Sequence, residues 1–270
     1  MIKHILERAK TIFKLTIKLV AVLLVLTALY SFNLFMMKPF SVDHFLSKEL
    51  ILDLIESPEE LTYVGILDRF DWITKHNSKL SIPQDEDIDN NIKQIEKVIK
   101  TLYKYDDSRL SDIQKSTKKI AIFDYENQLK ELKDFPYLDY PLNQIGGIHL
   151  NTIEFMNSVH PIRSDSEAIA FIKRTDLVKD VYQGVLNHLK KQADNGIYPP
   201  EFVYGHVINQ LDEFINVVNT EHPLYKQFML KIEKLELSND QVDYLEKEMK
   251  RSINESVTPG FKLLRNFMAN

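Results

Sequence analysis

Hydrophobic residues recur every three or four positions along most of this chain, which is the spacing of one face of an amphipathic α-helix. Two long runs cover residues 84–105 and 108–133, and the polar link at Asp106-Asp107 predicts that they pack as an antiparallel hairpin. Shorter helices are expected at 41–55, after Ser164, at 176–195, at 200–218, after Pro223, from Ser238 to a break or kink at Pro259, and through 261–267. Strands rich in Val and Thr are missing and there are only seven glycines, so the pattern predicts an all-α fold.

The first helix of the hairpin carries an isoleucine stripe that is expected to be core, and the second carries an apolar face of its own. The stripe consists of Ile88, Ile92, Ile95, Ile99 and Leu102, and the second face consists of Leu110, Ile113, Ile120, Phe123 and Leu129. Ser164 with Glu167, and Ser238 with Gln241, have the spacing of capping boxes, and Gly196 lies where a helix C-cap is expected.

Residues 19–37 form an uncharged apolar run between Lys18 and Lys38, just long enough to cross a membrane. Lysine and arginine precede the run, so the positive-inside rule predicts a cytoplasmic stub and membrane anchor at 1–38, with an exported domain at 39–270. The expected location is the inner (cytoplasmic) membrane, with the soluble part extracytoplasmic or periplasmic. A cleaved signal peptide is the alternative, but the run exceeds a usual signal core and no small-x-small cleavage site follows it.

The helical pattern breaks at residues 135–150, an irregular loop with two prolines and the pair Gly146-Gly147. Loops held by rigid helices often carry function. Tyr140, Asn143 and Gln144 are therefore candidate contacts for a substrate or partner.

His160 and Arg163 form the other polar candidate, just before a helix start. The fork of Arg163 suits a substrate carboxylate, and both side chains could point into a shared cleft. The favoured alternative is a structural pair that ties the loop to the helices. Trp72, the single tryptophan, is expected to pack onto the bundle as an anchor, with an aromatic cleft wall as its alternative.

The soluble part is acidic, which argues against nucleic acid as a partner. Residues 1–38 carry six Lys/Arg and one Glu, which leaves 28 basic and 38 acidic residues for the rest. Cysteine is absent, which excludes disulfides, thiolate metal sites, a cysteine nucleophile and an acylated lipoprotein anchor.

Catalytic and metal motifs are missing from the sequence. No two of the eight histidines lie three or four residues apart, so the His-Glu-x-x-His arrangement of zinc proteases is absent. A Gly-x-Ser-x-Gly elbow and a phosphate-binding glycine loop are also absent. The sequence predicts no catalytic residue and no metal ligand in this chain.

The phrases YPLNQIGG, VHPIRSDSEA and NGIYPPEFV resemble the N-terminal half of a bacterial family, domain of unknown function 885. The resemblance extends from about Ser57 to Pro259. It implies a largely helical, extracytoplasmic, zinc-metallopeptidase-like protein, whose zinc motif, His-Glu-x-x-Pro-Gly-His, follows this region.

That motif is absent here, so the resemblance predicts a truncated or split product that is inactive alone, with zinc only in the missing half. The expected partners are the membrane, a second copy or a separately encoded catalytic half, because the last helix would leave apolar residues uncovered. The alternatives are a self-contained bundle, in which that helix folds back onto residues 200–218, and a non-enzymatic envelope module that binds or scaffolds peptides or a partner protein.

Overall fold

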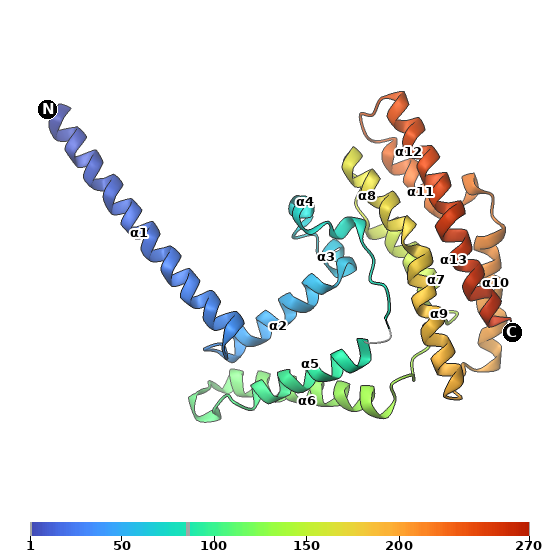
Figure 1. Ribbon diagram of the computed structural model, residues 1–270, viewed down its shortest axis with the longest axis horizontal. Coiled ribbons are helices and arrows are strands. Elements are labelled where there is room, and N and C mark those ends of the chain that lie inside the picture. The colour runs from blue at the N-terminus through green and yellow to red at the C-terminus, as the bar shows by residue number, and fades with distance from the viewer. Residues whose placement is uncertain (1, 85–86, 270) are drawn as a thin grey trace. The chain divides into compact units, whose positions relative to one another are not determined.

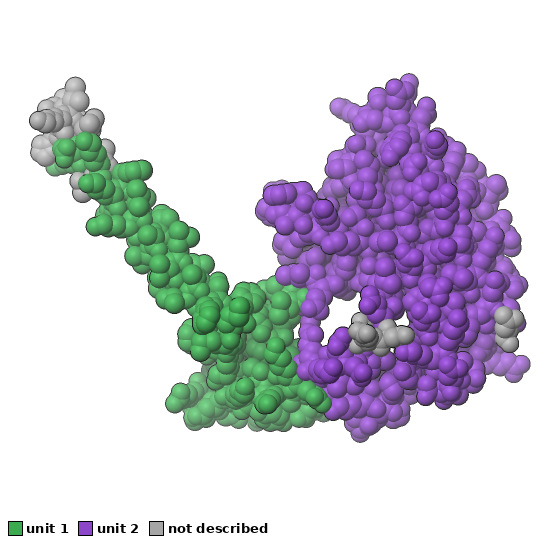
Figure 2. Space-filling view, viewed as in Figure 1, with its two compact units in different colours: residues 1–52, 95–127 green, residues 53–94, 128–270 purple. Residues whose placement is uncertain are grey.

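The computed structural model describes residues 2–84 and 87–269, and every regular element within those ranges is helical. The chain forms two compact units (Figures 1 and 2). Unit 1 contains residues 1–52 and 95–127, and unit 2 contains residues 53–94 and 128–270. The all-α prediction is confirmed.

Unit 1 begins with α1 (Ile2–Met36), which includes a candidate membrane span at Ile12–Met36 by length and composition. At its end the side chain of Asn33 holds the next residues in place. Its Nδ2 donates to Lys38 O at 3.1 Å, and its Oδ1 accepts from Phe40 N at 3.1 Å. The Tyr105 hydroxyl then donates to Pro39 O at 2.8 Å. The segment that follows α1 is thereby held to the rest of unit 1.

The hairpin consists of α5 (Asp87–Leu102) and α6 (Asp112–Asp134), joined by a short 3₁₀ turn (Asp107–Arg109). Its beginning was expected at residue 84, but positions 85 and 86 lie outside the described residues. The small core of unit 1 contains Phe45 of α2 (Val42–Glu56) together with Val98, Leu102 and Tyr105.

The expected apolar face of the second hairpin helix is partly wrong. Ile113, Ile120 and Phe123 are exposed, and α6 packs on the core through Ala121, Ile122 and Tyr125 instead. Lys118, one turn before Ile122, is buried on this face and donates to Tyr105 O at 2.7 Å. Lys118 is therefore buried, although the expected apolar face of this helix would have placed it at the surface.

Unit 2 is a bundle whose helices enclose one continuous hydrophobic core. Its helices are α3 (Pro58–Val64), α4 (Asp71–Thr74), α7 (Ile148–Glu154), α8 (Asp165–Asp176), α9 (Val178–Asp194), α10 (Glu201–Asn216), α11 (Pro223–Ile232), α12 (Asn239–Ser252) and α13 (Thr258–Met268). Two π-helical turns, Phe155–Val159 and Ile253–Val257, extend α7 and precede α13. The break or kink expected at Pro259 is not a chain break: α12 runs through the π-helical turn at Ile253–Val257 directly into α13, and Pro259 lies in the first turn of α13.

The last helix is covered by the chain itself. In α13, Phe261 and Leu264 are fully buried against α9 and α10. The ring of Phe261 stacks on Phe214 at 4.8 Å and meets the edge of Tyr182 at 5.3 Å. The expectation of an uncovered last helix is therefore wrong, and the alternative, packing onto residues 200–218, is confirmed.

The predicted helix ends are largely confirmed. Ser238 and Gln241 form a complete capping box, and Gly196 adopts a left-handed conformation with φ of 71°. The box at Ser164 is only half formed: its hydroxyl accepts from Glu167 N at 3.3 Å. The Glu167 carboxylate turns instead to the backbone N–H and guanidinium of Arg163.

Candidate functional site

The most highly connected polar side chain in unit 2 is Arg174, in the last turn of α8. It is fully buried and donates to acceptors on the segment that includes α3 and α4, which we call the α3–α4 segment (residues 57–81). These acceptors are Lys79 O at 2.7 Å, Thr62 Oγ1 at 2.9 Å, His76 O at 2.5 Å and Pro58 O at 3.4 Å, and a further bond goes to His160 Nδ1, outside the segment, at 2.8 Å. A planar guanidinium with five N–H donors is suited to such a set. Arg174 thus joins a long stretch of irregular backbone to the bundle.

Burial lowers the pKa of Arg174 to about 10, while the carboxylates of Glu59, Asp71 and Asp68 act in the opposite direction. The group is still a cation at neutral pH. A buried cation is tolerated when it is fully hydrogen-bonded and has counter-charges nearby. The α3–α4 segment supplies both, so its fold depends on this one side chain.

His76 lies at the centre of the α3–α4 segment, between two carboxylates. Its Nε2 is 3.3 Å from Asp68 Oδ1, and its Nδ1 is 3.1 Å from Asp71 Oδ1. The same Asp71 oxygen accepts from Asn77 N at 2.9 Å, and Asp68 also pairs with Arg163 at 2.8 Å. Asp68 and Asp71 are therefore turned inward.

This cluster does not fit a metal ion. Asp68 approaches Nε2 of His76 and Asp71 approaches Nδ1, so the two carboxylates contact different nitrogens of the ring. No grouping of three His, Cys, Asp or Glu side chains within the described ranges could hold a metal. The described residues therefore offer no site for the zinc ion, which the family resemblance places outside this chain.

His160 and Arg163 lie at different depths. His160 is buried and accepts from Arg174, and burial together with the Arg174 charge holds its pKa well below the usual value. Its backbone oxygen accepts from Lys231 at 2.8 Å. Arg163 is more than half exposed and forms ion pairs with Glu167 and Asp68. The pair ties the α3–α4 segment, rather than the loop at 135–150, to α8; a contact of either residue with a substrate stays a prediction.

Within the loop, Asn143 organises the backbone. Its amide donates to Tyr140 O at 3.0 Å, and its oxygen accepts from Ile145 N at 3.0 Å and Gly146 N at 2.8 Å. Gln144 contributes its backbone oxygen to Gln210 Nε2 at 3.1 Å. Both residues hold the loop in place, and a contact of their side chains with a ligand is untested.

Tyr140 lines a cavity of about 580 Å³ where the loop meets the ends of α9 and α13. Most of the lining is apolar or aromatic, with Tyr198 and Tyr204 adding hydroxyls. Gln192 contributes an amide that is held by Tyr137 O and Asp139 O. A volume of this size and composition is typical of a site for a small ligand or one large side chain.

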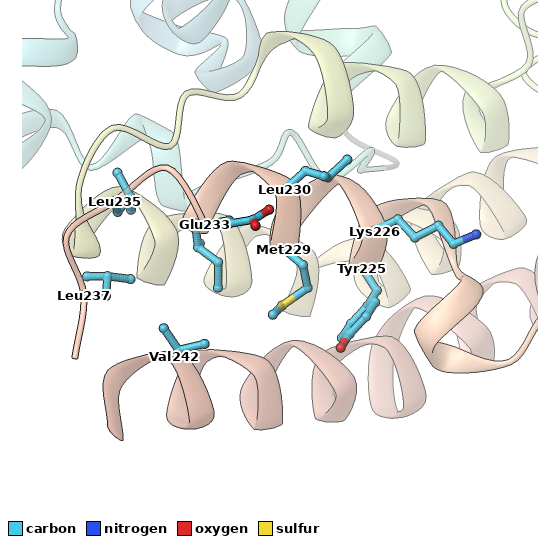
Figure 3. Close-up of a pocket in the computed structure, with 9 residues that line it drawn as sticks. Tyr225, Lys226, Met229, Leu230, Glu233, Leu235, Leu237 and Val242 are labelled. Atoms are coloured by element: carbon cyan, nitrogen blue, oxygen red, sulfur yellow. The ribbon is translucent and has the colours of Figure 1, made fainter. Parts of the chain in front are cut away.

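A second apolar hollow of about 630 Å³ lies between α11 and α12 (Figure 3). Met229, Leu235 and Val242 line it, and Lys226 and Glu233 stand at its edge. Tyr225, at one end, donates to Glu246 at 2.7 Å. The hollow is shallow, and its lining lacks the convergent polar groups of a specific site.

The sequence was also compared with known proteins. A family model described as "Bacterial protein of unknown function (DUF885)" matches residues 58–270, from the first residue of α3 onward. The chain belongs to the DUF885 family. No curated protein matches it.

Among solved structures, a candidate lipoprotein from Colwellia psychrerythraea has a similar fold, with a TM-score of 0.68 at 16% identity. The alignment covers 80% of this DUF885 chain and 39% of the Colwellia chain. The aligned part of this chain therefore spans well under half the length of the Colwellia protein. The family match and the neighbour agree with the helical fold, and within the described residues α1 adds one candidate membrane span.

Sequence reasoning missed Arg174. The one available signal is its position four residues after the buried Ala170 on α8, which places it on a buried face. An arginine there is ordinarily assigned to the surface, and its acceptors lie some 95 or more residues earlier in the chain, apart from His160.

Proposed function

We propose that this chain is the membrane-anchored, non-catalytic helical part of a zinc-metallopeptidase-like protein, and that zinc and the catalytic residues are supplied from outside residues 1–270. The observation that carries the proposal is the alignment with the Colwellia structure, in which four-fifths of this chain corresponds to 39% of a longer polypeptide. The missing zinc-ligand spacing supports it. The resemblance to DUF885 supplies the expected chemistry, a downstream His-Glu-x-x-Pro-Gly-His helix.

In this role the chain anchors and positions the catalytic part, and it supplies no catalytic residue itself. The candidate span in α1 would hold the protein in the inner membrane, and the absence of cysteine leaves this helix as its means of attachment. Asn33 and Tyr105 fix the exit from that helix. The bundle of unit 2 presents the cavity beside Tyr140, where an apolar side chain of a substrate or of the catalytic part would enter.

The test is to read the coding sequence on both sides of this chain and to co-express any product that carries His-Glu-x-x-Pro-Gly-His. We expect zinc-dependent peptide hydrolysis only when both polypeptides are present. Tyr140→Asp should weaken the activity, because it places a charge in an apolar cavity. Zinc-dependent hydrolysis by this chain alone would overturn the proposal.

The cavity favours a second candidate, a non-enzymatic envelope module that binds apolar segments of peptides. The probe is a blocked tripeptide with a central phenylalanine, and the control has alanine at that position. Saturable binding of the phenylalanine peptide but not of the alanine peptide, lost in Tyr140→Asp, would favour the binding module. The absence of a catalytic partner from the genome would favour it further over the zinc-dependent role.

A further inference from the structure

The α3–α4 segment carries a dense exposed apolar surface. Six large hydrophobic side chains between residues 63 and 73 are exposed: Tyr63, Val64, Ile66, Phe70, Trp72 and Ile73. Trp72 is 76% exposed, so the expectation that it anchors the segment onto the bundle is wrong. Six exposed large hydrophobic residues within eleven positions are unusual for a water-exposed segment and are typical of an interaction site. We call these six residues the aromatic patch.

The polar residues of the segment are divided between its two faces. Asp68 and Asp71 turn inward to Arg163, His76 and the backbone of Asn77. Arg69 and Lys75 remain exposed beside the aromatic patch. The outer face therefore combines tryptophan, tyrosine and aliphatic side chains with two cations, and Glu60 at the start of α3 is exposed as well.

Hydrogen bonds from the bundle also hold the α3–α4 segment in place. Arg174 bonds to it at Pro58, Thr62, His76 and Lys79, and α3 ends at Gly65, whose φ of 67° suits glycine. A surface that is already rigid loses little conformational entropy when it docks. The aromatic patch is thus a preformed surface and not a flexible loop.

We propose that the aromatic patch docks onto the lipid bilayer in which α1 is anchored, with Trp72 at the level of the headgroups and Arg69 and Lys75 against anionic lipid. Tryptophan and tyrosine concentrate at membrane–water interfaces, and basic residues beside apolar ones are typical of helices and loops that lie on membranes.

The tether to the membrane favours lipid over a soluble protein partner. Between Met36 and Tyr63 most of the chain is helical in α2 and α3, so its contour length is at most about 55 Å. A surface held so close to the bilayer meets it at a high effective concentration. The inference rests on the membrane anchor of the proposed function and is independent of its zinc chemistry.

Trp72 allows a direct test, because it is the only tryptophan of the chain. The full-length protein is reconstituted into vesicles of phosphatidylethanolamine with a quarter of phosphatidylglycerol, with either ordinary acyl chains or chains brominated near their glycerol end. We expect blue-shifted Trp72 emission that the brominated lipid quenches. Trp72→Phe combined with Tyr244→Trp is the matched control: it moves the probe to an exposed site on α12 among acids, where no quenching is expected.

The charges are tested with Arg69→Gln and Lys75→Asn. Asparagine suits the left-handed backbone of Lys75, whose φ is 53°. Each substitution should shift the docking equilibrium about fivefold towards the free state, equivalent to about 1 kcal/mol per cation. The shift should vanish in vesicles of phosphatidylcholine alone.

Several outcomes overturn the proposal. Trp72 emission that is neither blue-shifted nor quenched shows that the aromatic patch stays in water, and a blue shift without quenching shows that protein, such as a second copy, covers it. Equal quenching of both probes shows unspecific adsorption. A chain that fails to float with the vesicles overturns the anchor as well, whereas a floating chain with unquenched Trp72 overturns the docking alone.

Discussion

Replacing Arg174 by methionine removes the guanidinium while keeping an unbranched side chain of similar length. The substitution leaves the buried acceptors Lys79 O, His76 O and Thr62 Oγ1 without their donor. Each buried polar group left unpaired costs about 1–3 kcal/mol, and breaking a buried charged network costs about 3–5 kcal/mol. We expect a loss of roughly 3–5 kcal/mol, concentrated in the α3–α4 segment.

The assay is hydrogen exchange by mass spectrometry on the full-length protein in lipid nanodiscs. Amides of residues 57–81 should exchange far faster in Arg174→Met, since 4 kcal/mol corresponds to about a thousandfold in the opening equilibrium. Arg174→Lys should give an intermediate loss, because a single ammonium group cannot reach acceptors spread around a planar fork.

The matched control is Arg163→Gln, which removes an exposed arginine that lies outside the segment and pairs with its Asp68. Its ion pairs with Asp68 and Glu167 are partly solvated, so we expect at most about 1 kcal/mol. Equal exchange in Arg174→Met and the wild type, or a larger effect of Arg163→Gln, would refute the assignment of Arg174 as the residue that holds the segment.

Three further predictions concern stability and topology. Burial lowers the pKa of His222 to about 4. As pH falls from about 6.5 to 4, the unfolded state therefore takes up a proton that the folded state does not, and the free energy of unfolding drops by roughly 3 kcal/mol. His222→Asn keeps the helix cap and should flatten the pH dependence of the denaturation midpoint in this window by one proton. Gly184→Ala should destabilise by about 1–3 kcal/mol, because its Cβ would lie 2.5 Å from Pro83 O, whereas Gly205→Ala in the open interior of α10 should stabilise by about 0.5–1 kcal/mol; thermal melts that rank the two the other way would contradict the packing. A reporter fused to the C-terminus should be active only outside the cytoplasm, and activity inside would reverse the proposed orientation.

Hydrophobic spacing predicted the secondary structure well because most helices of unit 2 have one face on a common core. It also predicted the packing partner of the last helix, as one of two alternatives, through the apolar positions Phe261 and Leu264. It failed on α6, where Ile113 and Phe123 are exposed and Lys118 is buried. Periodicity identifies a helix, but it does not show which face the neighbouring helix covers when both carry apolar residues.

The polar arrangement was less accessible to sequence reasoning. His160 and Arg163 were identified as a pair, but Arg174, the residue that joins His160 to the α3–α4 segment, gave no signal of its own. Such networks depend on distant backbone carbonyls, and every residue type supplies these equally. Trp72 was misplaced for a related reason: a large aromatic residue is assigned to a core by default, and only the structure shows that this one is exposed.

The central claim, that this chain supports zinc-dependent chemistry but does not perform it, is tested most directly by the zinc content of the full-length protein. The chain is purified in lipid nanodiscs, dialysed against buffered zinc, and analysed by mass spectrometry for metal per polypeptide. The account predicts much less than one zinc ion per chain, because the described histidines and carboxylates do not converge on a common point. One tightly held zinc ion per chain, with peptide hydrolysis that chelation abolishes, would contradict it.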